Sequence, residues 1–166
     1  MNIKILKTNE NDLTLLEEIY DLSFESNPSP PTKIILTEEE KNETDLSPKI
    51  SFNDSKKITL SIFYDEKLIG GVIISPSEDN LNILERLFIH PNYQRKGIGF
   101  QVWNHIENNY SNEKGWILRS PTYLINNACF YINKCGFTIS KVEDVGDDGI
   151  GMFVYTKKIN NDSSKE

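Results

Sequence analysis

A strand, a glycine-bearing turn and a helix follow one another between residues 81 and 110, and this unit constrains the fold more than any other stretch. Residues Asn82–Ile89 are rich in Leu, Ile and Phe with polar residues between them, which predicts a strand. Pro91 has no backbone N–H to donate to a sheet, so the strand is expected to end near it. A helix is expected to open at Gly97-Ile98-Gly99. Its sheet-facing stripe is predicted to consist of Gly99, Trp103, Ile106 and Tyr110.

The turn of this unit has the chemistry of an anion-binding site. The start of a helix leaves backbone N–H groups without partners and carries a partial positive charge. Glycines allow a phosphate to approach that backbone closely, and Arg95 and Lys96 add two full positive charges beside it. The alternative is a tight turn whose glycines only satisfy the backbone geometry.

Composition narrows the classes of protein that fit. The 166 residues are most simply one domain, expected to span residues 1–159, with a disordered polar tail at 160–166. No apolar run approaches the roughly 20 residues of a membrane helix, and the N-terminus lacks the apolar core of a signal peptide. A net charge of −7 argues against nucleic acid and anionic membranes as partners. We therefore predict a cytoplasmic protein.

The cysteines and histidines give no support for a metal site. Cys129 and Cys135 are six residues apart on a predicted helix and lie on different faces of it, which disfavours both a disulfide and a metal pair. The chain has only two histidines and no Cys-x-x-Cys motif. We predict chemistry without a metal.

The remaining elements alternate between strands and helices. Helices are predicted at about residues 12–24 and from Asn126 or Asn127 to residue 134, and a capping box at residues 37–40 predicts a short acidic helix. Residues 42–57 are polar and are predicted to be irregular, without a clear core role. The other predicted strands are residues 2–8, 58–64, 68–75, 116–120, 137–142 and 152–159.

The connections between these elements indicate a mixed α/β fold. A short hairpin turn joins strands 58–64 and 68–75, so the early strands are expected to be antiparallel. The helix between strands 82–89 and 116–120 implies a parallel pair with a right-handed crossover. Gly70 and Gly71 predict a bulge or a close backbone approach. The result is a central sheet of about six or seven strands, flanked by helices.

The loop Gln94-Arg95-Lys96-Gly97-Ile98-Gly99 fits the Gln/Arg-x-x-Gly-x-Gly/Ala signature of the GCN5-related N-acetyltransferase (GNAT) superfamily. It is not a Walker loop, because no Gly-Lys-Ser/Thr follows, and Val102 stands where a dinucleotide fingerprint has its third glycine. The element order also resembles that family, over roughly residues 57–159 and more loosely at the N-terminus.

The resemblance implies a binding mode for acetyl-CoA in a V between two partly splayed strands, here 82–89 and 116–120. The pantetheine arm would pair with the backbone of Leu87, Phe88 and Ile89, which are otherwise ordinary strand residues. The pyrophosphate would lie on the N–H groups of residues 95–99. The residues implied for the cofactor are Leu87, Phe88, Ile89, Gln94, Arg95, Lys96, Gly97, Ile98, Gly99, Asn126 and Asn127. The two asparagines have a helix N-cap as the alternative role.

The late helix carries a candidate general acid. Family members often have a tyrosine here that protonates the departing thiolate, and Tyr131 matches it. A phenol suits this role because its reference pKa is about 10. Four residues separate Tyr131 from Gly136, where three are commoner, so a π-bulge would be needed to restore the position. The alternative is a core aromatic.

Glu85 is the best candidate for a general base. Period-two counting places it on one strand face with Ile83, Leu87 and Ile89, where a carboxylate is unfavourable unless it is exposed or paired. The alternatives are a salt bridge with Arg86 or Arg119, or exposure at a strand end. His90 is a weaker candidate.

These residues together predict an acyl-CoA-dependent N-acetyltransferase. A primary amine of a small molecule or peptide would attack the thioester directly, with the backbone N–H of Leu87 or Ile89 stabilising the oxyanion. One alternative is a catalytically silent acyl-CoA sensor or partner-binding module, and another is a nucleotide-binding domain. Homodimers are common in the family, so a dimer is compatible with the resemblance.

Overall fold

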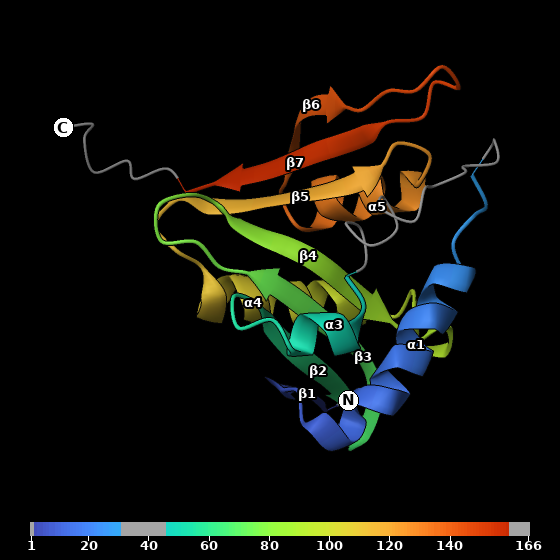
Figure 1. Cartoon of the computed structure of the whole chain (residues 1–166), viewed down its shortest axis with the longest axis vertical. Helices are drawn as coiled ribbons and strands as arrows, with labels where there is room; N and C mark the ends of the chain where they lie inside the picture. Colours follow the sequence, from blue (N-terminus) through green and yellow to red (C-terminus); the bar gives the residue numbers. More distant parts are fainter. Residues whose placement is uncertain (1, 31–45, 160–166) are drawn as a thin grey trace.

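The computed structural model describes residues 2–30 and 46–159, which form one mixed sheet with helices on both faces (Figure 1). The seven strands of the described residues lie in the order β1-β2-β3-β4-β5-β7-β6. Their bounds are β1 Ile3–Lys7, β2 Ile58–Tyr64, β3 Lys67–Ser75, β4 Asn82–Ile89, β5 Gly115–Pro121, β6 Thr138–Glu143 and β7 Met152–Lys158. The predicted fold class is confirmed, and each predicted strand is found within about two residues of its expected bounds.

The helices cover the two faces of the sheet in pairs. Helices α1 (Leu13–Glu25) and α3 (Pro48–Phe52) lie on the face that is in front in Figure 1, and α4 (Ile98–Tyr110) lies behind. Helix α5 (Ile125–Cys129) packs on the same side as α4, because its residue Ala128 joins the apolar cluster of α4. Two 3-10 helices, Glu10–Asp12 and Pro91–Tyr93, and a π-helix, Phe130–Lys134, complete the described helical segments.

One prediction about the loop before β2 is wrong. The sequence predicts an irregular segment at residues 42–57, yet α3 forms there, with Pro48 in its first turn and the Ser47 hydroxyl accepting from the Ile50 N–H. Ser51 is fully buried, so this segment does contribute to the core. A helix of five residues is too short to show a helical period in sequence. The acidic helix predicted from residues 37–40 falls outside the described residues, as does the tail at 160–166.

The antiparallel half of the sheet contains the backbone approach that its glycines predict. Ile62 pairs with Gly70 and Phe63 with Leu68, which leaves Ile69 as the extra residue of a bulge. A Cβ atom on Gly70 would lie 2.2 Å from the carbonyl oxygen of Phe88. No side chain fits at this position, so β3 and β4 can pair closely only with glycine there.

Two apolar clusters fill the two faces. The larger cluster lies under α4 and α5 and contains the aromatic residues Trp103, Trp116, Tyr131, Phe137 and Tyr155. The smaller one lies under α1 and contains Leu16, Ile19, Leu68, Ile73 and Phe88. The predicted sheet-facing stripe of α4 is found: Trp103 and Ile106 are buried, Tyr110 is half-buried against the same cluster, and Gly99 faces Ile89 of β4. Ile98 and Val102 are also buried and widen the stripe.

Over the described ranges 2–30 and 46–159, no helix has both the length and the apolar character needed to cross a membrane.

Candidate active site

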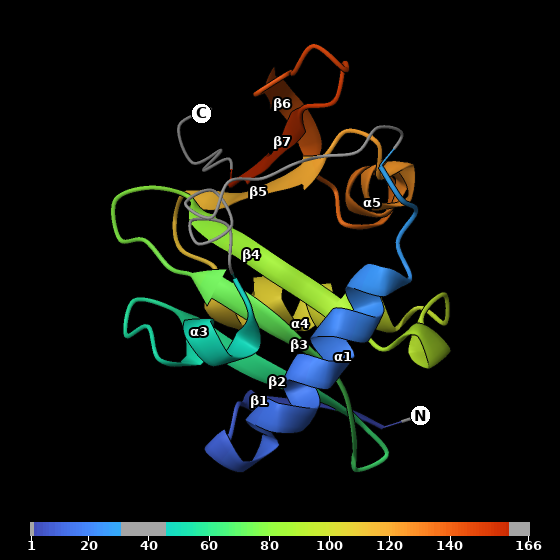
Figure 2. The same cartoon turned by 45° about the vertical axis from the view of Figure 1, so that its right-hand side comes forward.

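The parallel strands β4 and β5 pair only at their beginnings. Asn82 pairs with Trp116 and Ile83 with Ile117, and no further pairing follows in the rest of either strand. Figure 2 shows the two strands diverging toward their C-terminal ends, with α5 beside the wide end. The predicted splay is therefore present, and it leaves one backbone edge of β4 without a strand partner from Leu84 to Ile89.

A buried amide network holds the narrow end of this V together. The Asn82 side chain is 1% exposed, and its Nδ2 donates to the carbonyl of Tyr110, the last residue of α4, at 2.8 Å. Its Oδ1 accepts from the Ser77 N–H at 2.8 Å and from Asn112 Nδ2 at 3.0 Å. These bonds tie the start of β4 to the end of α4 and to the turn before β5. Sequence reasoning missed this network, because an asparagine at a strand start has no distinctive pattern.

A β-bulge at Glu85 changes which face of β4 each residue occupies. Ile74 pairs with Leu84 and Ile73 with Arg86, so Glu85 is the extra residue. Beyond the bulge, Leu87 and Ile89 pack in the cluster under α4, and Phe88 packs under α1. The prediction that Glu85 shares a face with Leu87 and Ile89 is therefore wrong, because a bulge interrupts the two-residue period.

Glu85 faces the α1 side, where a serine hydroxyl holds its carboxylate. The Ser75 hydroxyl donates to Glu85 Oε1 at 2.9 Å, and the carboxylate is half-buried. The salt bridges that were the alternative to a base role are absent from the described residues: Arg86 Nη1 donates to the backbone carbonyl of Glu85 at 2.8 Å, and Arg119 Nε binds Glu143 at 3.1 Å. The carboxylate thus remains available to a proton donor.

A cavity of about 220 Å³ opens beside Glu85 at the point where the strands diverge. Arg86 lines it from β4, Arg119 from β5, and Met152 from β7. Neither Arg86 nor Met152 had a predicted role in the site, although Arg86 directly follows Glu85.

The free edge of β4 directs two N–H groups into the V. The His90 N–H donates to the Ile69 carbonyl of β3 at 2.7 Å. Because successive N–H groups of a strand point in opposite directions, those of Leu87 and Ile89 point away from β3 and toward β5. Gln94 Nε2 donates to the Ile89 carbonyl at 2.8 Å, so this side chain fastens the loop to the end of β4.

The loop after β4 presents an exposed helix start. Gly97 is the N-cap of α4 with φ at +78°, and Arg95 also has a positive φ of +62°. A Cβ atom on Gly97 would meet nothing within 4 Å, so the glycine leaves open space in front of the helix. Arg95, Lys96 and Gly97 are exposed and Ile98 is buried. Free N–H groups and two cations at a helix start suit a phosphate group.

Gly99 has a packing role as well. A Cβ atom on it would lie 3.3 Å from the Phe130 ring and 3.7 Å from Ile89 Cδ1. Its small size therefore lets α4 approach both the end of β4 and the π-helix.

The predicted π-bulge is confirmed. The Cys135 N–H donates to the Phe130 carbonyl at 3.2 Å, an i→i+5 bond, within the π-helix. The Tyr131 ring packs against Phe130, Phe137 and Tyr155 with centroid distances of 5.0, 5.8 and 5.7 Å. Tyr131 is 8% exposed. Burial raises the pKa of its hydroxyl well above the usual value, and the positive charge of Arg86 offsets only part of this rise.

The two asparagines of α5 occupy different environments. Asn127 Nδ2 donates to the Ser120 hydroxyl of β5 at 3.0 Å, whereas Asn126 is exposed. The alternative role as N-cap is wrong for both, because Leu124 is the N-cap of α5. Asn127 links the wide end of β5 to α5, and its partner Ser120 was not predicted.

Histidine and cysteine contribute little to this site. His90 Nδ1 accepts from the Asn92 N–H at 3.1 Å, which makes it the cap of a 3-10 helix. Both cysteines are free thiols, and burial raises the pKa of Cys135 to about 12. Among residues 2–30 and 46–159 there is no group of three or more His, Cys, Asp or Glu side chains placed to hold a metal ion.

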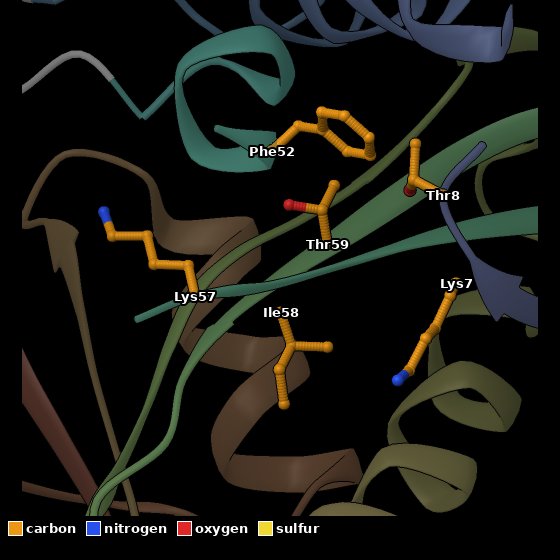
Figure 3. Close-up of a pocket in the computed structure, with 6 residues that line it drawn as sticks. All are labelled: Lys7, Thr8, Phe52, Lys57, Ile58 and Thr59. Atoms are coloured by element: carbon orange, nitrogen blue, oxygen red, sulfur yellow. The ribbon is translucent and has the colours of Figure 1, made fainter. Parts of the chain in front are cut away.

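A second hollow of about 200 Å³ lies where β1 ends and β2 begins (Figure 3). Phe52 of α3 covers it, and Lys7, Thr8, Lys57 and Thr59 line it. None of its lining residues belongs to β4 or β5, so it is separate from the V.

Comparison with known proteins agrees with this geometry. The family model described as "Acetyltransferase (GNAT) domain" matches residues 56–139, just over half of the chain. The chain therefore belongs to the GNAT family. Uncharacterized protein YrkN of Bacillus subtilis (strain 168) is 36% identical over 90 residues, 54% of this chain and 49% of YrkN. The match thus spans about half the length of this curated relative.

Solved structures share the fold over nearly the whole chain. An acetyltransferase from Thermus thermophilus superposes with a TM-score of 0.70 at 17% identity, covering 96% of this chain and 98% of that chain. The PaiA N-acetyltransferase of Thermoplasma acidophilum, solved in complex with coenzyme A, gives a TM-score of 0.64 at 20% identity, covering 95% and 100%. These likenesses establish the acetyltransferase fold.

Proposed function

We propose that this protein transfers an acetyl group from acetyl-CoA to a primary amine, without a metal. The observation that carries the proposal is the V itself: β4 and β5 pair at two positions only, and a glycine-capped helix start stands at the wide end. The proposed domain is residues 1–159, beyond the matched residues 56–139, because β1 and β7 belong to the same sheet.

The chain's own groups fit acetyl-CoA at two places. The unpaired backbone of Leu87 and Ile89 would hold the amide-bearing arm as an added strand. The N–H groups of residues 95–99, with the Arg95 and Lys96 charges, would hold the pyrophosphate, and the empty space in front of Gly97 gives it room. Coenzyme A as the ligand is supported by the Thermoplasma protein of similar fold, which was solved in complex with coenzyme A.

Three groups would carry the chemistry. Glu85 would accept the proton of the attacking amine at the cavity beside the bulge. The N–H groups of Leu87 and Ile89 would stabilise the negative charge that develops on the reacting carbonyl oxygen. Tyr131 would donate its proton to the departing sulfur as the carbon–sulfur bond breaks. Its raised pKa keeps that proton in place at neutral pH.

A calorimetric titration with acetyl-CoA tests the cofactor site. We expect the wild-type protein to bind acetyl-CoA more tightly than ATP, and Gly97→Val to weaken binding about a hundredfold or more, because the new side chain fills the space for the pyrophosphate. Gly149→Val is the matched control: Gly149 has φ at +81° and open space around its Cβ position, but lies in the β6–β7 loop. Equal losses for both variants, or no binding by the wild type, would refute the site.

A silent acyl-CoA sensor is the second candidate, and the burial of Tyr131 is the observation that favours it. A phenol with a strongly raised pKa is a weaker acid, so proton transfer to the thiolate is less favourable. Tight acetyl-CoA binding without turnover across a wide panel of amines would favour the sensor over the enzyme.

A further inference from the structure

Arg86 is a half-buried cation without a carboxylate partner among the described residues. Its Nη1 donates to the backbone carbonyl of Glu85 at 2.8 Å, and its Nε donates to the Tyr20 hydroxyl at 3.4 Å. Its guanidinium also lies 5.7 Å from the Phe24 ring centre. All three contacts are with neutral groups, and a guanidinium has five N–H donors. Charge and hydrogen-bonding capacity therefore remain at the wall of the 220 Å³ cavity.

The other arginine of this cavity is already neutralised. Arg119 Nε binds Glu143 at 3.1 Å, and Glu143 also binds Lys141 at 2.8 Å. Arg119 is more exposed and belongs to a surface cluster with its own anion. Of the two arginines that line the cavity, Arg86 is the one without a carboxylate partner in the described part of the chain.

Helix α1 holds the Arg86 side chain in place. Tyr20 and Phe24 lie one turn apart on that helix, and their rings are 4.7 Å apart at the centroids. The Tyr20 ring also packs edge-on against Phe88 at 5.1 Å, which anchors it to β4. A guanidinium held in this way loses little side-chain entropy when it binds an anion, so the site is preorganised.

Glu85 and Arg86 present opposite charges to the same cavity without pairing with each other. They are adjacent at the bulge, both line the cavity, and Arg86 contacts only the backbone oxygen of Glu85. The carboxylate is held by Ser75 instead. A guest that carries an ammonium and an anion close together would match both charges at once.

We propose that the acceptor is an amino carboxylate, whose amine is directed to Glu85 and whose carboxylate is bound by Arg86. This deepens the proposed function and rests on it. One guanidinium balances the single charge of a carboxylate, whereas a phosphate monoester carries about −1.5 to −2. The cavity has the volume of about seven water molecules, which suits a molecule of amino-acid size.

Matched pairs of acceptors test this proposal. Each common L-amino acid and its carboxamide are assayed with acetyl-CoA and the wild-type protein, and kcat/KM is compared within each pair. We expect at least one amino acid to be acetylated about tenfold or more faster than its amide. The proposal is overturned if amides are equal or better throughout, or if no member of any pair is acetylated although acetyl-CoA binds.

Variants separate recognition by Arg86 from a structural role. For the best amino acid, Arg86→Gln is expected to raise KM about 10- to 150-fold, while KM for its amide changes little. The wild type and Arg86→Gln are compared on the same amino acid and amide, so the difference in basicity between the two amines cancels. Arg119→Gln is the control and is expected to leave the acid-to-amide ratio unchanged.

Two results would contradict this role for Arg86. An equal loss for acid and amide would show that it only supports the fold. If Arg119→Gln changed the acid-to-amide ratio as much as Arg86→Gln does, the effect would come from the loss of any positive charge near the cavity. Failure of the wild type to bind acetyl-CoA would refute the proposed function itself, which is a separate outcome from failure of acceptor recognition.

Discussion

The two ends of the β4–β5 pair differ in what holds them. At the narrow end, two residue pairs and the buried Asn82 amide join the strands to each other and to the end of α4. At the wide end β4 has no strand partner on this side, and the Gln94 side chain donates to its Ile89 carbonyl. Across the V, Asn127 of α5 donates to Ser120 of β5.

This difference shows how the fold produces a binding cleft. Backbone groups that are buried without partners are unfavourable, so an unpaired strand edge in the middle of a sheet marks a place for a ligand that supplies the missing bonds. The bulge at Glu85 lies between the two ends and directs two charged side chains, Glu85 and Arg86, to the opening. The narrow end is thus held by more contacts, and the wide end is where the proposed binding and chemistry would take place.

The largest effect is expected at the wide end, from Tyr131→Phe. If Tyr131 is the general acid, kcat falls about 10²- to 10⁴-fold while the affinity for acetyl-CoA is kept. Tyr155→Phe is the matched control, because that buried hydroxyl has no hydrogen-bond partner among the described residues and no proposed chemical role. A steady-state assay with a turned-over amine measures both variants. An unchanged kcat for Tyr131→Phe would leave Tyr131 as a core aromatic only.

At the narrow end, Asn82→Ala is expected to lower the free energy of unfolding by about 3 kcal/mol. The change removes three hydrogen bonds and takes the Asn82 partner away from part-buried backbone groups of Tyr110 and Ser77. Gln94→Ala removes a 2.8 Å bond to the Ile89 carbonyl and a long, exposed 3.5 Å bond to the Ser26 hydroxyl, and is expected to cost about 1 kcal/mol. Urea unfolding measures both. Equal losses would show that the two ends are held alike.

The smallest effect is a pH dependence of stability that also comes from Tyr131. Its pKa is raised by burial in the folded protein, while the unfolded chain keeps a value of about 10, so the folded state holds the proton more tightly. The contribution of this proton to the free energy of unfolding is fully present below pH 10 and is lost as the pH rises above 10. The melting temperature measured from pH 8 to 11 should therefore fall less steeply for Tyr131→Phe than for the wild type. Parallel curves would contradict the assignment.

Local sequence patterns were enough to predict most elements and the loop of the site. Periodicity predicts the strand Asn82–Ile89, turn chemistry predicts the hairpin around residue 65, and glycine geometry predicts the helix that opens after Gly97. All three signals depend only on neighbouring residues. The extra residue between Tyr131 and Gly136, compared with the family spacing, raised a π-bulge as one of two alternatives, and the π-helix is present.

Tertiary contacts decided the remaining features. The bulge that places Glu85 and Arg86 together depends on the register between β3 and β4, and a one-residue shift changes the face of every later side chain. Three other features depend on residues that are distant in sequence: the position of β7 between β5 and β6, the length of the β4–β5 pairing and the partners of Asn82. The sequence by itself determined most of the elements and the glycine turn before α4. Only the tertiary structure decided which charges face the cavity, because that depends on strand register and long-range packing.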